Sequence, residues 1–555
     1  MRKFAYIYAL LLPSFAVAET LNIRQGSVTY MIASDSADEM MFNDGKTLAV
    51  GGMVFDLTTV SRMFVDNAVI PSEILVAYSG SGADVTVPVS SAVGASVEVN
   101  GAQVSIVTTA PLSVRVSGSS TVGQFALKTS EPVSVTLENL VLTNPSDAAV
   151  SLTGSGKVDL IISGENSLAS GSASEKPTLR FKTPAEISGN GSLTVTAVAA
   201  AEKAIKSNDN LTISGGEITA TVSGMALYDS TNKKVKATAC IASDLDMLIS
   251  GGTLNLTATG AGGKGISADG NLTVCGGDIT IKTSGGMAVY SGSSLNQNYT
   301  GNTDRISSDL KTSPKGIKVD GSILISGGNI DVTTSGNGGE GIESKATLNI
   351  SDGTITVCAY DDAINSSSYM YISGGDITVI AKNNDGLDSN GNMYISGGTI
   401  RAFGSQAPEC GLDANEEQGY SVIFTGGMIL GVGGNNSVPS SSASTQPYLT
   451  SSISLSAGQT LQIKDGSEIL AEFTIPSDYS SSGNGGGWRP APPMFRLSGM
   501  HTPPPAAAPP VMAPGGWGGP GGSQGGGVLV SLPTLVKGKS YTMTNGSSSS
   551  AATAK

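Results

Sequence analysis

Apolar residues recur along this chain with a period much longer than that of a helix. The phrase ISGGxIT, or a close variant, returns seven times, and its first turn residue is Ser214, Ser250, Cys275, Ser326, Ser351, Ser373 or Ser396. The shortest steps between these turns are 22, 23 and 25 residues. A repeat of this length predicts a solenoid in which each repeat is one coil.

Each repeat carries apolar residues at fixed distances from its turn. Around Ser373 they are Met370, Ile372, Ile377 and Val379, so the members of each pair are two residues apart, as inward positions on a strand must be. An antiparallel sandwich also has short strands and glycine turns, but it would not repeat equivalent residues every 22 to 25 positions. We therefore predict an all-β chain built as a right-handed parallel β-helix, a solenoid with small β caps or modules at both ends. The two glycines after each turn residue are expected to supply the positive φ of a tight corner.

The pattern changes along the chain and predicts six segments. They are a signal peptide at 1–18, a small N-terminal β element at 19–80, the parallel β-helix at 81–436, a β-rich C-terminal cap at 437–479, a Gly/Pro-rich low-complexity loop at 480–527, and a final strand and tail at 528–555.

The N-terminus has the pattern of an export signal. Arg2 and Lys3 precede an apolar run that ends in Ala16-Val17-Ala18, so we expect cleavage after Ala18 and a mature protein that is secreted, extracellular or periplasmic. No later apolar stretch approaches the roughly 20 residues that a transmembrane helix needs.

Composition excludes several classes of function. The formal net charge of −14 repels nucleic acid, and an acidic sugar polymer would need a bridging cation or a local basic patch. The single histidine, His501, lies in a Pro-rich stretch, which argues against a Ser-His-Asp hydrolase and against zinc. Four cysteines in 555 residues do not make a disulfide framework, and we interpret them as small residues filling the stack: Cys240, Cys275, Cys358 and Cys410.

Two polar columns flank an inward Ile or Leu that precedes each turn, and both change from basic to acidic along the chain. The first column reads Lys203, Lys264, Lys315, Glu340, Asp362, Asp385 and Cys410. The second reads Lys206, Ser267, Lys318, Glu343, Asn365, Asp388 and Asp413.

Carboxylates on neighbouring coils would lie about 5 Å apart and repel one another, so an acidic ladder needs a counter-cation or raised pKa values. Calcium, with 6 to 8 oxygen ligands, would suit the ladder. The candidate ligands are Asp361, Asp362, Asp385 and Asp388, with Glu340, Glu343 and Asp413 at the edges of the site. An ordinary solvated acidic turn remains the alternative.

Outward positions on two adjacent coils carry Tyr371 and Tyr394, and two exposed rings stacked in this way are predicted to form a flat surface for a sugar. Tyrosine is also common on strand surfaces without any ligand. Basic residues of the coils are candidates for charge-assisted contact with a uronate carboxylate: Lys315, Lys318, Lys345, Lys382 and Arg401.

The ISGGxIT turns, the change from KGIKVDG to NDGLDSNG, and the Gly-rich segment before VLVSLPTLVKGKSYT resemble a bacterial carbohydrate-binding family of polysaccharide-lyase-like β-helices. The resemblance covers roughly residues 85–545 and leaves out 19–80. It implies a secreted right-handed β-helix that binds calcium and plant cell-wall polymers, including cellulose and acidic sugars, without cleaving them. It places the calcium at Asp361, Asp362, Asp385 and Asp388, which occupy the DDG-like turns of the family. The chain departs from the family pattern where DDA replaces DDG, at Ala363, and at Asn365.

Similar β-helices include calcium-dependent pectate lyases, so β-elimination is the main alternative function. In such a lyase a base removes the proton α to a uronate carboxyl group that calcium neutralises. Lys382 is the first candidate for the base and Arg401 the second. A structural or adhesive surface protein is a further alternative, and nothing in the sequence indicates the oligomeric state.

Overall fold

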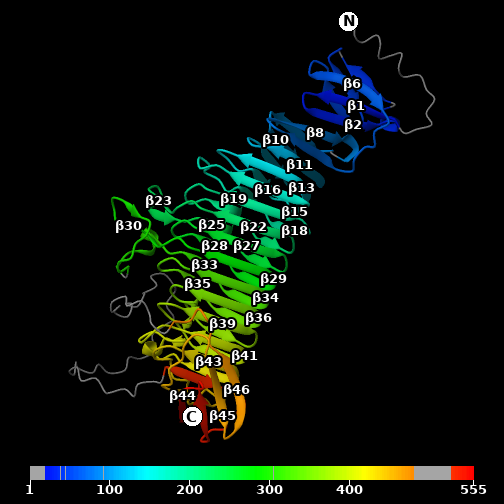
Figure 1. The fold of residues 1–555 in the computed structure, drawn as a ribbon. Helices are drawn as coiled ribbons and strands as arrows, with labels where there is room; N and C mark the ends of the chain where they lie inside the picture. The colour runs from blue at the N-terminus through cyan, green and yellow to red at the C-terminus, as the bar shows by residue number, and fades with distance from the viewer. Residues whose placement is uncertain (1–18, 38, 44, 92, 304, 481–526) are drawn as a thin grey trace, which may run out of the picture. The chain divides into compact units, whose positions relative to one another are not determined.

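The structure is a computed structural model, and it describes residues 19–37, 39–43, 45–91, 93–303, 305–480 and 527–555. These residues form an all-β fold, a β-solenoid of about 13 turns with small sheets at the ends, which confirms the predicted parallel β-helix (Figure 1). They contain no α-helix, and thus none that could cross a membrane; their helical turns are η1 (Ser34–Ser36), η2 (Val89–Ser91), η3 (Ser308–Leu310) and η4 (Glu416–Gln418). The predicted signal peptide and nearly all of the predicted Gly/Pro-rich loop lie outside the described residues.

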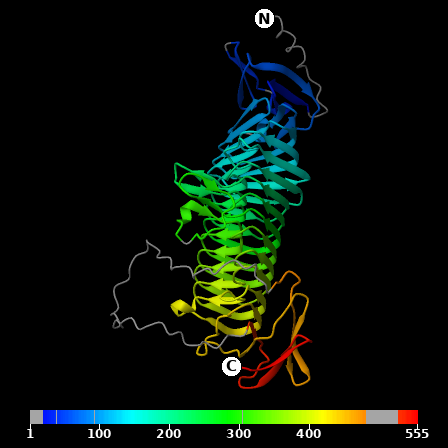
Figure 2. The ribbon, with the colours of Figure 1, turned by 60° about the vertical axis from the view of Figure 1, so that its left-hand side comes forward.

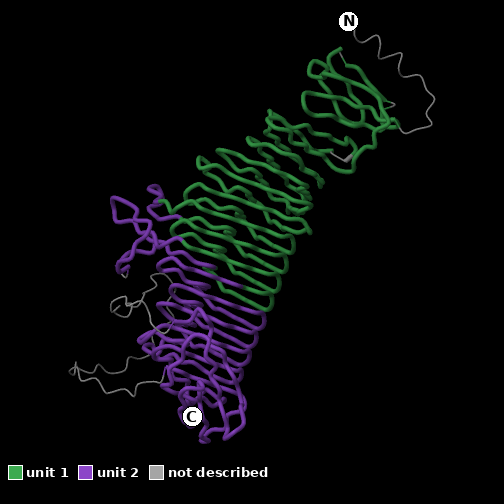
Figure 3. The backbone as a smooth tube through the Cα atoms, in the orientation of Figure 1, with its two compact units in different colours: residues 1–227, 237–284, 317–330 green, residues 228–236, 285–316, 331–555 purple. Residues whose placement is uncertain are grey.

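The chain divides into two compact units (Figure 3). Unit 1 contains residues 1–227, 237–284 and 317–330, and unit 2 contains residues 228–236, 285–316 and 331–555. Strands β33 (Lys315–Val319) and β34 (Ile323–Thr334) contain residues of both units.

Unit 1 begins with a small β element that has its own core. Ile23, Leu48 and Phe55 are fully buried in it. β1 pairs antiparallel with both β2 and β6, and β3, β4 and β5 form a separate small sheet. The strands are β1 (Thr20–Gln25), β2 (Val28–Ala33), β3 (Met41–Asn43), β4 (Thr47–Val50), β5 (Met53–Asp56), β6 (Val60–Asp66), β7 (Ile74–Ser79) and β8 (Gly82–Pro88).

The coils of unit 1 contribute strands to two sheets. The first contains β9 (Ala95–Asn100), β10 (Gln103–Thr108), β12 (Gln124–Thr129), β14 (Val150–Gly154), β17 (Leu179–Lys182), β20 (Lys203–Ser207), β25 (Ala239–Ser243) and β28 (Lys264–Ala268). The second contains β11 (Leu112–Ser120), β13 (Val133–Asn144), β15 (Val158–Ser163), β16 (Glu165–Ser170), β18 (Ala185–Gly189), β19 (Ser192–Ala197), β21 (Leu211–Ile213), β22 (Glu217–Val222), β26 (Met247–Ile249), β27 (Thr253–Ala258) and β29 (Leu272–Thr283). Equivalent residues are in register: Ile205 pairs with Ile241, which pairs with Ile266, and all three are buried. The predicted apolar columns are therefore the core of the solenoid.

Unit 2 repeats this arrangement, and its strands stack in parallel layers (Figure 2). Its coil strands are β35 (Glu340–Ser344), β36 (Leu348–Ala359), β37 (Ile364–Ser366), β38 (Met370–Ile372), β39 (Asp376–Ala381), β40 (Leu387–Ser389), β41 (Met393–Phe403), β42 (Leu412–Ala414) and β43 (Val422–Val432). Ile342, Ile364, Leu387 and Leu412 stack in register on successive coils. The same register aligns the second polar column from Glu343 to Asp413, as the sequence predicts.

The two glycines of each ISGG turn have different roles, which corrects the prediction that both adopt positive φ. The second glycine does so, with φ of 90° at Gly375 and 85° at Gly398. The first glycine lies against the preceding coil: a Cβ at Gly374 would be 2.0 Å from the Ser351 carbonyl oxygen. It is glycine because a side chain there would hold the coils apart.

Unit 2 also contains an insertion and a terminal sheet. The insertion carries β23 (Leu227–Asp229), β24 (Lys234–Lys236), β30 (Ala288–Tyr290), β31 (Leu295–Asn296) and β32 (Lys311–Thr312). The C-terminal strands are β44 (Tyr448–Ser451), β45 (Thr460–Asp465), β46 (Glu468–Thr474), β47 (Val528–Ser531), β48 (Ser540–Thr544) and β49 (Ser549–Thr553). β47 pairs antiparallel with both β43 and β44, so chain segments on either side of the Gly/Pro-rich stretch meet in one sheet.

Candidate functional site

Short acidic side chains line neighbouring coils of unit 2 where the chain enters β37 and β40. Asp362 and Asp385 precede these strands and are only 6% and 7% exposed. Asp388, within β40, pairs in register with Asn365 on β37. The predicted metal ligands Asp362, Asp385 and Asp388 are thus on adjacent coils and close to one another.

One amide group joins two of these carboxylates. The Asn365 Nδ2 donates to Asp362 Oδ2 at 3.2 Å and to Asp388 Oδ2 at 2.9 Å. No ion pair to any of the three aspartates is found among the described residues. Their charge is therefore offset only by neutral hydrogen-bond donors, which is a costly arrangement in a buried site.

Burial and mutual repulsion change the acidity of this cluster. Burial, followed by the charge of Asp388, raises the pKa of Asp362 well above its usual range. Burial and Asp388 do the same to the pKa of Asp385, although its Oδ1 accepts a hydrogen bond from the Cys410 backbone N at 2.6 Å. Burial and the charge of Asp413 raise the pKa of Asp388 to about 8. Without a cation, the folded chain favours protonated carboxyl groups here.

The edges of the predicted metal site differ from its centre. Asp413 accepts a hydrogen bond from Ser437 Oγ at 3.0 Å, and burial raises its pKa. Asp361 is partly exposed and its backbone N donates to the Gly339 carbonyl oxygen at 2.9 Å.

Glu340 and Glu343 have a protein counter-cation. The Lys315 Nζ lies 2.5 Å from Glu340 Oε1 and 3.1 Å from Glu343 Oε2, and Lys345 also pairs with Glu343. Burial raises the pKa of Glu340 to about 7, whereas the two lysines overcome burial and lower the pKa of Glu343. Lys315 itself is 6% exposed. The Lys315 ammonium group is buried between two glutamates, so the predicted contact with a sugar would require these ion pairs to break.

The donors at the centre of the cluster decide whether calcium could bind there. Within the described ranges, no three His, Cys, Asp or Glu side chains converge closely enough to hold a metal ion. The donors of Asp362, Asp385, Asp388 and Asn365 nevertheless match calcium in kind, since they are hard oxygen atoms that lack a cation. If calcium binds in this unit, Asp362, Asp385, Asp388 and Asn365 are the residues that would hold it.

A tyrosine cluster lies on the outer surface of unit 2. The rings of Tyr371 on β38 and Tyr394 on β41 are stacked, with centroids 4.9 Å apart and planes within 4°. The ring centroid of Tyr369 lies 6.3 Å from that of Tyr371 and 6.1 Å from that of Tyr420, and the rings of Tyr369 and Tyr420 meet edge to face. Tyr369 and Tyr420 precede strands at positions outside the apolar columns, so only their residue type could have suggested them.

The stacked geometry changes how this surface can hold a sugar. Tyr371 and Tyr394 cover each other's inner faces, so a sugar could contact only their ring edges or outer faces. Tyr371 remains 39% exposed and Tyr369 36% exposed. The four rings form a rough surface with different ring orientations, which can contact both apolar and hydroxyl groups of a ligand.

The other predicted basic contacts have different surroundings. Lys318 pairs with Asp320, and Arg401 pairs with Asp376 and also donates to Thr378. Lys382 is exposed, and its ammonium group lies beside the Cys358 thiol.

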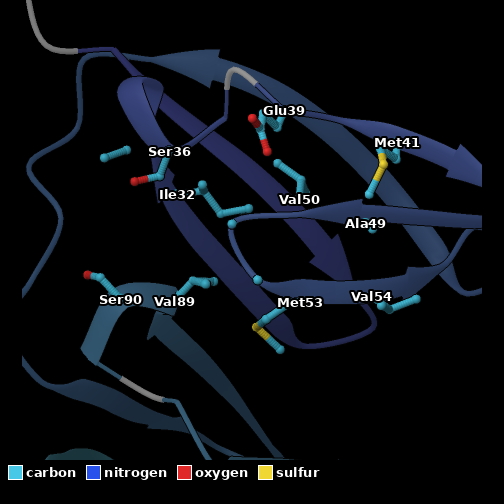
Figure 4. A pocket seen from close by; sticks show the side chains of 13 residues that line it. Ile32, Ser36, Glu39, Met41, Ala49, Val50, Met53, Val54, Val89 and Ser90 are labelled. Carbon is cyan, nitrogen blue, oxygen red and sulfur yellow. The ribbon is translucent and has the colours of Figure 1, made fainter.

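A separate cavity of about 530 Å³ lies in the N-terminal element of unit 1 (Figure 4). Ile32, Val50 and Val89 line it together with the exposed Glu39. None of the predicted site residues contributes to it.

Comparison with known proteins now identifies the family. A family model described as "Carbohydrate-binding domain-containing protein" matches residues 100–338 and 332–485, which is more than half of the chain. The chain belongs to the carbohydrate-binding domain-containing family. A comparison with curated proteins found no match. A solved structure titled "Structure of the polysaccharide lyase-like protein from C. thermocellum, Gadolinium derivative" is 15% identical, covering 58% of this chain and 96% of that one with a TM-score of 0.29. The likeness to this solved structure is too distant to inform the chemistry. The range of this carbohydrate-binding family member that the family model matches includes both the acidic cluster and the tyrosine cluster.

Proposed function

We propose that this protein is an exported, non-catalytic polysaccharide-binding protein that uses calcium and recognises plant cell-wall or other acidic glycans. The observation that carries the proposal is the cluster of Tyr369, Tyr371, Tyr394 and Tyr420 on the surface of a carbohydrate-binding family member. Tyrosine supplies rigid amphipathic contact area at a low cost in conformational entropy. The export part of the proposal rests on the sequence of residues 1–18.

Calcium enters the proposal through the buried aspartates. A bound calcium ion would offset two of the three negative charges of Asp362, Asp385 and Asp388. It would thereby stabilise the coils next to the tyrosines, since β38 lies between β37 and β40 in the chain. Calcium would then support glycan binding by keeping these coils in register, without any requirement that it touch the sugar.

Binding without cleavage is supported by the surroundings of the candidate bases. The guanidinium group of Arg401 pairs with Asp376 and donates to Thr378 Oγ1, so these contacts would have to break before Arg401 could act on a substrate. The Lys382 ammonium group lies beside the Cys358 thiol. A lyase base would have to lie beside the calcium-bound uronate, and thus near the acidic cluster.

The test is retention on a panel of immobilised polysaccharides that includes cellulose and polygalacturonate, with calcium or with a chelator. The double variant Tyr371→Ala/Tyr394→Ala should lose about tenfold in affinity, because each ring that packs against the ligand is expected to contribute roughly 0.5–1.5 kcal/mol. Tyr371→Phe/Tyr394→Phe keeps the rings and is the matched control, which should lose less. Equal retention by the Ala variant and the native protein would contradict the tyrosine site. Formation of unsaturated uronate products would contradict the non-catalytic proposal.

A further inference from the structure

The insertion of unit 2 forms a compact module of its own, which we call the lysine insert: residues 228–236, 285–303 and 305–312. β24 packs against β30, β32 and η3, and β30 pairs antiparallel with β31 and β32. Figure 1 shows β23 and β30 side by side. The residues of the lysine insert lie outside the ISGG repeats, so the repeats of the solenoid do not require them.

Aromatic stacking joins the two segments of the lysine insert. The rings of Tyr228 and Tyr290 are stacked with centroids 3.6 Å apart and planes within 3°. The Tyr290 hydroxyl donates to the Gly292 carbonyl oxygen at 2.8 Å, and Asn337 Nδ2 donates to the Tyr299 carbonyl oxygen at 2.7 Å. The turn between β23 and β24 is therefore held on a defined support.

The turn carries positive charge that the protein itself does not neutralise. Its only acidic residue, Asp229, accepts hydrogen bonds from the backbone N of Thr231 and Asn232 at 2.9 and 3.1 Å and pairs with Lys236 Nζ at 2.5 Å. Lys233 and Lys234 follow and are exposed. No described residue pairs with either ammonium group.

The backbone at Lys233 gives an independent reason to assign a role to this turn. Lys233 has a φ of 53°, a left-handed conformation that glycine or asparagine adopts at lower cost than lysine. The requirements of the turn therefore do not explain a lysine at this position. Strained residues of this kind are concentrated at ligand-binding sites.

We propose that the lysine insert is a second polysaccharide-contact site, selective for anionic chains, in which Lys233 and Lys234 pair with the carboxylates of uronate sugars. The inference rests on the proposed function. It assigns the recognition of acidic glycans to residues outside the tyrosine cluster. A protein with a net charge of −14 repels a polyanion over most of its surface, so contact requires a local group of unpaired cations. The exposed lysine turn supplies that group, and the stacked tyrosines hold it in place.

The experiment compares retention of the full-length protein on polygalacturonate and on cellulose, at one fixed calcium concentration and increasing sodium chloride. The test variant is Lys233→Glu/Lys234→Glu. The control is Lys128→Glu/Lys282→Glu, which changes two exposed coil lysines and alters the net charge equally. We expect the test variant to bind polygalacturonate about tenfold more weakly, with a reduced salt dependence, and to keep cellulose binding within twofold. The control variant should bind both polymers like the native protein.

The outcomes separate this inference from the proposed function. Binding of the native protein to neither polymer would overturn both. Native binding to cellulose alone, equal losses in test and control variants, or unchanged polygalacturonate binding by the test variant would overturn only the lysine insert as an acidic-glycan site. Tighter native binding to single-stranded DNA than to polygalacturonate would also overturn it, because the turn would then recognise polyanions in general.

Discussion

The first polar column carries lysines as far as Lys315 and acidic residues from Glu340 to Asp385, and these two stretches of the chain manage their charge in different ways. Lys203 Nζ donates to the Ala201 carbonyl oxygen at 2.5 Å, and Lys264 Nζ donates to the Gly262 carbonyl oxygen at 3.0 Å. A long side chain can turn back to its own coil in this way while remaining partly in solvent. Asp362 and Asp385 are short and stay buried, and an ionised carboxylate has no proton to donate to a carbonyl oxygen. A lysine at this position of the coil is tolerated without an ion pair, whereas a buried aspartate at the same position needs a counter-cation or a bound proton.

Lys315 lies where the two stretches meet, and there the protein supplies the cation itself. Its ammonium group pairs with Glu340 and Glu343 on the next coil, and Lys345 also pairs with Glu343, so two lysines offset two glutamates. The next coils contain Asp362, Asp385 and Asp388 with no described lysine or arginine paired to them. Under the proposed function, calcium would supply to these aspartates the positive charge that no described lysine or arginine supplies.

The largest expected effect comes from removing the cation at the junction. Lys315→Met should lower the free energy of unfolding by about 3–5 kcal/mol, because it leaves the buried Glu340 without its cationic partner and Glu343 paired only with Lys345 among the described residues. Lys264→Met removes only a partly exposed lysine and should cost about 1 kcal/mol. Thermal and urea unfolding of both variants would measure the difference. Equal costs would mean that the buried ion pairs contribute no more than a surface hydrogen bond.

A second, smaller effect is the pH dependence of the metal-free protein. Asp362, Asp385 and Asp388 have a raised pKa in the folded chain, so at intermediate pH the folded state holds protons that the unfolded state has released. The free energy of unfolding should then fall, on the order of 2 kcal/mol, as the pH rises from about 4 to about 8. If these carboxylates were ion-paired and had lowered pKa values, the free energy of unfolding would instead rise with pH at the acidic end of this range.

The measurement is Tm in a chelator across this pH range, compared with Tm in excess calcium. Asp388→Asn should flatten the fall and raise Tm at pH 8, because it removes one member of the repelling group. Calcium should raise the Tm of the native protein at pH 8, and should do so less for Asp362→Asn/Asp388→Asn. A Tm that rises with pH in the chelator would contradict the raised pKa values.

The repeat made most of the solenoid predictable from the sequence. The columns through Ile364 and Leu387 specify strand register, and the same register brings Tyr371 onto Tyr394 and Asn365 onto Asp388. Positions that repeat with the coil can therefore be placed relative to one another from the amino-acid sequence alone.

Features that depend on side-chain reach or on insertions could not be predicted in this way. The burial of Lys315 follows from where its flexible side chain ends, and the bridging amide of Asn365 depends on a rotamer rather than on register. Tyr228 and Tyr290 meet although they belong to segments with no repeat to align them. Charge and residue type indicated which coils carry candidate site residues, but only the contact geometry shows which of these residues lie together.

The smallest expected effect concerns an ion pair on the surface of the acidic unit. Arg401 and Asp376 have side chains that are 28% and 57% exposed, so water already solvates both charges. Arg401→Gln should change the free energy of unfolding by less than about 0.5 kcal/mol, in contrast with Lys315→Met, because exposed pairs gain little and are screened by salt. It should also leave polygalacturonate retention within twofold of native, since Asp376 engages the guanidinium group. A tenfold loss of retention with unchanged Tm would instead show that Arg401 leaves Asp376 to bind the glycan, and would extend the sugar-contact surface along β41 from Tyr394 to Arg401.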